Sequence, residues 1–90
     1  MNKPLKQSPP NLMKHPKVFH TKLGRHKADG LQRPGEIFID PRLPPKRKLV
    51  VMVHELLHDM HPTWPEERVE REGEHIGTFL WKHGYRKVEQ

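Results

Sequence analysis

Apolar residues recur every three to four positions over residues 45–60, the spacing of one helix face. Their arc is wide, which predicts a largely buried central helix. Pro45 suits its first turn, where a missing N–H costs no hydrogen bond, and Pro62 is expected to follow its end. The helix is therefore predicted over Pro45–Met60. Its apolar positions are Leu49, Val50, Val53, Leu56, Leu57 and Met60.

A second apolar stripe follows Pro62 after a tight turn. Thr63 and Glu66 have the spacing of a capping box, which predicts Thr63 as the N-cap of another helix. Gly84 is predicted to stop that helix. Because so short a turn joins them, the two helices should pack side by side and antiparallel. The inner stripe is predicted to contain Val69, Gly73, Ile76, Gly77 and Leu80.

Two short segments before the helices have the composition of strands, namely residues 18–21 and 36–40. Ile37 and Ile39 should face the same side of a sheet. The connection contains Asp29-Gly30 and Pro34-Gly35, so antiparallel pairing is expected. The predicted fold class is α+β: short antiparallel β-strands, then a central helix and a C-terminal helix packed antiparallel.

Composition divides the chain into an arm and one small domain. Residues 1–16 carry four of the ten prolines and little periodic apolarity, which predicts a flexible basic arm before a domain over 17–90. A chain of 90 residues with 32% hydrophobic residues has a thin core, so a bound metal is expected to help it fold. Cysteine is absent, which excludes disulfides and thiolate ligands and leaves His, Asp and Glu.

The charge and the hydropathy of the chain indicate which partners to expect, nucleic acid or a membrane. Seventeen Lys and Arg against eleven Asp and Glu give +6, and this basic excess lies mostly before residue 50. Such a charge suits nucleic acid, but no aromatic-interleaved RNA-binding pattern or DNA-reading motif accompanies it. No apolar run reaches the roughly 18 residues that span a bilayer, and no signal-peptide stretch opens the chain. We expect a soluble cytoplasmic protein without a membrane partner.

The motif His54-Glu55-Leu56-Leu57-His58 carries the candidate chemistry. It places two imidazoles one helical turn apart, within reach of one zinc ion. In H-E-x-x-H sites the glutamate is the general base that takes a proton from zinc-bound water, here Glu55. A surface helix could match this pattern by chance. The apolar residues around the motif argue against that reading, because burying these groups without a partner would cost several kcal/mol.

A third protein ligand is expected from the second helix. Midway between the two histidines, the antiparallel partner should lie near residue 68, and side chains lean toward their own N-terminus, which favours Glu70. Glu74, one turn later, could accept the second N–H of a ligating histidine. Glu66 also faces inward and stays an alternative ligand, although its capping position explains it without metal. His61 lies about 10 Å from His54 along the axis, too far to share the ion.

Val69-Glu70-Arg71-Glu72-Gly73-Glu74, followed by Ile76-Gly77-Thr78, resembles the glutamate helix of gluzincins, the thermolysin-like zinc peptidases. The resemblance spans residues 36–83 and is nearest to minimal zincin-like members. It implies His54, His58 and Glu70 as ligands, Glu55 as base and Glu74 as orienting carboxylate, although the family commonly has Asp there. His75 is expected at the surface; as third ligand it would instead imply similarity to SprT-like proteases.

These expectations describe a zinc metallopeptidase. An unfolded protein or peptide substrate would pair with an edge strand formed by Ile37, Phe38 and Ile39. A terminal segment in the cleft could hold such a protease latent. The alternative is a non-catalytic zinc domain whose basic arm contacts nucleic acid or a protein partner.

Overall fold

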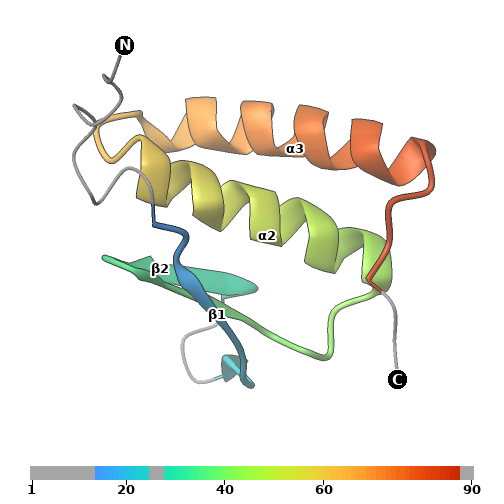
Figure 1. The fold of residues 1–90 in the computed structure, drawn as a ribbon, viewed down its shortest axis with the longest axis horizontal. Coiled ribbons are helices and arrows are strands. Elements are labelled where there is room, and N and C mark those ends of the chain that lie inside the picture. The colour runs from blue at the N-terminus through green and yellow to red at the C-terminus, as the bar shows by residue number, and fades with distance from the viewer. Residues whose placement is uncertain (1–13, 25–27, 88–90) are drawn as a thin grey trace, which may run out of the picture.

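The computed structural model describes residues 14–24 and 28–87. In chain order they form strands β1 (Lys17–His20), β2 (Gly30–Arg33) and β3 (Glu36–Ile39), then helices α2 (Pro45–Met60) and α3 (Glu66–Lys82). The elements stack in three layers, with α2 between α3 and the sheet (Figure 1). The predicted α+β class is confirmed. Neither described helix has the length and apolarity needed to cross a membrane.

The sheet is mixed, with the strand order β1-β3-β2. β2 and β3 form an antiparallel hairpin through the turn at Pro34 and Gly35, and Gly35 has the positive φ of 78° that such a turn requires. β1 pairs with β3 in parallel, so the expected antiparallel pairing of these two strands is wrong. The reason is the unpredicted strand β2. It occupies the antiparallel side of β3, and β1 joins the opposite side.

β3 is the central strand, hydrogen-bonded on both sides. Ile37 and Ile39 are fully buried and pack with Val51 of α2, so their predicted common face is confirmed. Because both edges of β3 are occupied, the prediction that Ile37, Phe38 and Ile39 form a substrate edge strand is wrong. In the described part of the sheet the edge strands are β1 and β2.

The bounds of α2 agree with the predicted helix. The predicted capping box of α3 is wrong: the N-cap is Pro65, with φ of −69°, and no side chain caps the helix. The Glu66 carboxylate, which was expected to reach back to Thr63, points to the histidines of α2 instead. Gly84 follows the helix with a φ of 86°, as expected for a stop residue.

Two glycines set the antiparallel contact of α2 and α3. A Cβ on Gly73 would stand 3.2 Å from the Cα of His54, and one on Gly77 would stand 2.9 Å from the Cα of Val50. The backbones therefore approach so closely that only a narrow stripe of α3 is buried, namely Val69, Gly73 and Gly77. Ile76, predicted in this stripe, is 36% exposed, so that part of the prediction is wrong.

Candidate metal centre

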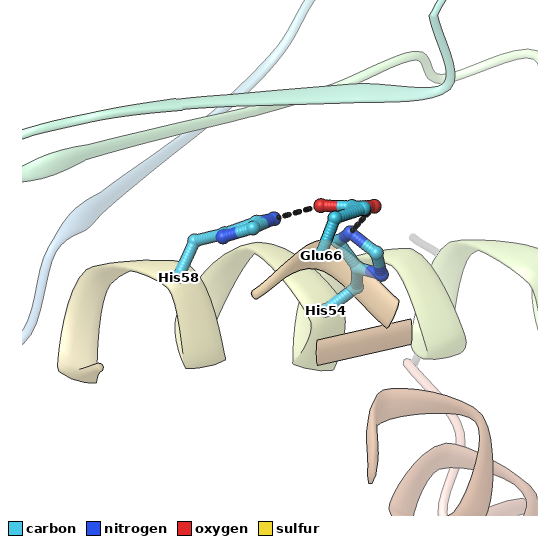
Figure 2. A group of neighbouring side chains, drawn as sticks. All are labelled: His54, His58 and Glu66. Atoms are coloured by element: carbon cyan, nitrogen blue, oxygen red, sulfur yellow. Dashed lines mark hydrogen bonds and ion pairs between the residues drawn. The ribbon is translucent and has the colours of Figure 1, made fainter. Parts of the chain in front are cut away.

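The two histidines of the motif lie on one face of α2. Their ring centroids are 4.9 Å apart, and both side chains are half-buried. The helical repeat produces this geometry directly, because residues four apart stand one above the other. Figure 2 shows both rings directed toward the same carboxylate, which comes from the neighbouring helix.

That carboxylate is Glu66, the first residue of α3. Its Oε2 lies 3.1 Å from Nε2 of His54, and its Oε1 lies 2.8 Å from Nε2 of His58. One ligand atom from each of the three residues lies within 4.8 Å of the others. Two imidazole nitrogens and one carboxylate oxygen converging in this way could hold a metal ion.

The separations suit a small tetrahedral cation. Zinc bonds to nitrogen and oxygen measure about 2.0–2.2 Å, so neighbouring ligand atoms around the ion stand about 3.3–3.5 Å apart. The two nitrogen–oxygen distances are slightly shorter, as hydrogen bonds are. The Glu66 side chain is 64% exposed, so the solvent leaves room for the small movement that would open the required space. The three residues fit the group that the motif implies.

Of the three glutamates predicted near the metal, the structure places one in this cluster and two beside it. Glu66, the alternative ligand, joins the histidines, whereas Glu70 and Glu74 line the pocket beside them. Glu70 as ligand and Glu74 as orienting carboxylate therefore stay predictions. The helix register does not account for this outcome. Gly73 faces His54, so α3 is displaced toward later residues than the expected alignment gives, whereas Glu66 lies earlier on the helix.

The loop between the helices explains that displacement. Residues 61–65 separate α2 from α3, a longer connection than the predicted tight turn about Pro62. Trp64 is sandwiched in this loop, with the His61 ring stacked at 3.9 Å and the Arg68 guanidinium 3.8 Å from its ring. The stack fixes the loop that delivers Glu66. His61 is thus a helix-end residue, as expected, and His75 is exposed, as expected.

Glu55 lies on the sheet side of α2 and is only 7% exposed. Burial raises the pKa of its carboxyl above the ordinary value; the charge of His58 lowers this pKa in part, and the charge of Glu66 raises it. A Cβ on Gly30 would stand 3.0 Å from Oε2 of Glu55 and 2.6 Å from Cγ1 of Val51. Glycine at this place lets β2 lie directly over the carboxylate.

Asp59 is a residue that the sequence reasoning missed. Its Oδ1 accepts hydrogen bonds from Nε2 of Gln32, at 3.2 Å, and from the backbone N–H of Gly35, at 3.4 Å. These contacts tie the β2–β3 hairpin to α2 immediately after His58. An acidic residue following H-E-x-x-H gives no such indication by itself, because its partners lie more than twenty residues away in sequence.

A pocket of about 330 Å³ adjoins the cluster. Its lining includes Val50 and Val51 of α2 and the carboxylates of Glu66, Glu70 and Glu74 of α3. Across the pocket, Arg47 of α2 donates to Asp29 at 3.0 Å, just before β2 begins. The cluster of His54, His58 and Glu66, the buried Glu55 and this cavity therefore adjoin one another between β2, α2 and α3.

No family model, curated protein or solved structure matches this chain. The gluzincin resemblance thus rests on the motif and on the residues quoted for it. The geometry adds a glutamate from the following helix beside the two histidines. Most of the arm, residues 1–16, lies outside the described residues.

Proposed function

We propose that the protein is a zinc-dependent peptidase whose metal ligands are His54, His58 and Glu66. The observation that carries the proposal is the convergence of these three residues beside a buried glutamate that lines the same pocket. A purely structural zinc site has no use for Glu55, whose burial without a partner has a free-energy cost. Carboxylates whose pKa is shifted by burial are common at catalytic sites.

The residues divide the chemistry between them. A bound zinc ion would supply a Lewis acid and lower the pKa of a coordinated water toward 7. The histidines act as neutral donors, and Glu66 contributes the single negative charge of the ligand set. Glu55 accepts the proton of the water that attacks the peptide carbonyl and later delivers it to the leaving nitrogen. Burial raises the pKa of its carboxyl, which makes the carboxylate a stronger proton acceptor.

The substrate strand would lie along β2. This strand is an edge of the described sheet, and its first residue, Gly30, lies against Glu55 and lines the pocket. An extended peptide pairing with β2 would bring its backbone past the general base. β2 thus takes the role that residues 37–39 had in the sequence interpretation. Peptides and unfolded proteins present such a backbone.

The test is casein-type proteolysis by zinc-loaded wild type and Glu55→Gln. The variant should keep one zinc ion per chain and lose turnover by about 10²–10⁴-fold, the usual contribution of a general base. Glu67→Gln, an exposed neighbour of Glu66 on α3, is the matched control and should keep full activity. Chains lacking residues 1–16 are assayed in parallel, because a terminal segment in the cleft would mask activity. Full turnover by the Glu55→Gln variant would refute the mechanism.

A further inference from the structure

The pocket beside the metal cluster has an acidic wall made by α3. Glu66, Glu70 and Glu74 all line it, each one helical turn after the last. Both oxygens of Glu66 face the histidines. At 1.5 Å per residue, Glu70 stands about 6 Å and Glu74 about 12 Å beyond Glu66 along the helix. A side chain entering beside the metal would therefore meet Glu70 first.

These two carboxylates have no cationic partner among residues 14–24 and 28–87. Glu74 accepts a hydrogen bond from the Thr78 hydroxyl at 3.3 Å, and Glu70 forms no ion pair with any of these residues. Arg47 is the basic residue of the pocket lining, and Asp29 already pairs with it. The pocket thus keeps an excess of negative charge in a chain whose net charge is +6.

A second observation shows that the pocket is built for an occupant. Glu55 is 7% exposed, lines the pocket, and accepts no hydrogen bond from residues 14–24 and 28–87. No fully buried side-chain oxygen of these residues lacks a partner, so the Glu55 carboxylate opens to the pocket, where an occupant can pair with it. Val50 and Val51 also line the pocket and offer apolar atoms to the methylene stem of a long cationic side chain.

We propose that this pocket selects substrates with a Lys or Arg side chain next to the scissile bond, held by Glu70 and Glu74. The inference rests on the proposed peptidase function, and it names the substrate class of the same site. It assigns both glutamates to substrate selection, and metal binding to Glu66. An ion pair within the partly enclosed pocket should favour a basic over a neutral side chain by about tenfold, or 1.4 kcal/mol.

The first experiment measures peptide binding to a variant that is expected to lack turnover. Zinc-loaded Glu55→Gln is titrated into two pools of short fluorescein-labelled peptides, with random neutral residues around one central Lys or one central Met. We expect about tenfold tighter binding of the Lys pool, decreasing with salt. Adding Glu70→Gln or Glu74→Gln should remove the preference while zinc stays at one ion per chain. Adding Glu67→Gln should preserve it.

Cleavage of the unlabelled pools by wild type, read by mass spectrometry, then separates two failures. Selective binding without cleavage supports the pocket assignment and refutes the proposed peptidase function. Cleavage without any preference for Lys overturns the pocket assignment and leaves the peptidase function standing. Equal binding of both pools overturns the pocket assignment as well. Loss of zinc in Glu70→Gln, or two zinc ions in wild type, would show that these carboxylates bind metal instead.

Discussion

At the scale of one residue, the role proposed for Glu55 as general base opposes the stability of the fold. In the metal-free protein its raised pKa means that the folded state disfavours the ionised carboxylate. This destabilisation is present at pH values above the folded-state pKa. It disappears as the pH falls below the pKa of the unfolded chain, where both states are protonated.

Metal-free Glu55→Gln should therefore be more stable than wild type at pH 7. A gain of about 1 kcal/mol is typical when a strained functional residue is neutralised, and it would raise the Tm of a domain this small by about 4–8 °C. Thermal unfolding followed by circular dichroism measures it. The gain should shrink at pH 4. A lower Tm for the variant at pH 7 would contradict this account of Glu55.

Asp40 is the opposite case, a buried carboxylate with every partner in place. It accepts hydrogen bonds from the backbone N–H groups of Leu23 and Arg42 and from the Arg42 guanidinium. The Arg42 guanidinium, helped by the two N–H groups, holds the pKa of Asp40 well below its usual range. A lowered folded-state pKa stabilises the fold above the unfolded value near 4, and the contribution is lost as the pH falls further.

Asp40→Asn should therefore lower the Tm by several degrees at pH 7, and the difference from wild type should decrease below about pH 4. Unfolding curves at pH 7 and pH 2.5 measure both effects. Asp29→Asn, at a half-exposed ion pair with Arg47, is the control and should change the Tm little. A constant difference between wild type and Asp40→Asn across this pH range would contradict the assignment.

At the scale of single residues, the sequence predicted those site residues that lie within one turn of the same helix. His54 and His58 are four residues apart on one helix, so their spacing fixes their common face. Glu66 reaches the same point through the conformation of the intervening loop. The spacing between Thr63 and Glu66 predicted capping, and only the stack around Trp64 shows why α3 begins two residues later than that prediction implied.

At the scale of helices and strands, the contact between α2 and α3 depends on glycines, which let the two backbones approach closely. Gly77→Ala would place a Cβ 2.8 Å from Cγ2 and 2.9 Å from the Cα of Val50, and the backbone atom cannot turn away. Overpacking of this kind costs about 1–3 kcal/mol. That exceeds the gain of about 1 kcal/mol in helix propensity from glycine to alanine.

Denaturant unfolding should therefore show that Gly77→Ala is destabilised, despite its better helix former. Arg71→Ala, at an exposed position of the same helix, is the control and should stay within about 0.5 kcal/mol of wild type. If Gly77→Ala were as stable as wild type or more so, the close approach of the helices would be in error.

A helix or strand could be predicted where its apolar pattern extends over several repeats of the sequence. The sixteen residues of α2 contain several apolar repeats between two prolines, and its bounds were predicted correctly. β2 has four residues, Gly-Leu-Gln-Arg, too few and too polar for an alternating pattern. Its hydrogen bonds to β3 make it a strand. Missing β2 also led to the wrong orientation of β1 and to the wrong edge strand.

At the scale of the whole molecule, the core is thin, so we propose that a bound zinc ion stabilises the fold. Few apolar side chains are buried, and Ile37, Ile39 and Val69 are the largest that are fully so. Zinc binding to the folded state alone should stabilise the protein by about 2.7 kcal/mol at a free concentration one hundred times its Kd.

The Tm of wild type should accordingly rise by about 10–20 °C on zinc addition, at about 4–8 °C per kcal/mol. His58→Ala should lose most of this rise, whereas the exposed-site variant Glu67→Gln should retain it. Scanning calorimetry with buffered zinc measures the shift. A wild-type Tm that is independent of zinc would contradict the linkage between metal and fold.

The most direct measurement of the central claim is the metal content of purified, dialysed protein after exposure to zinc, for wild type and the variants His58→Ala, Glu66→Ala and Glu70→Ala. The account predicts one zinc ion per chain in wild type and in Glu70→Ala, and a large loss in His58→Ala and Glu66→Ala. Retention of zinc by Glu66→Ala together with its loss from Glu70→Ala would contradict the ligand set. A wild type that binds no zinc would contradict the metal centre itself.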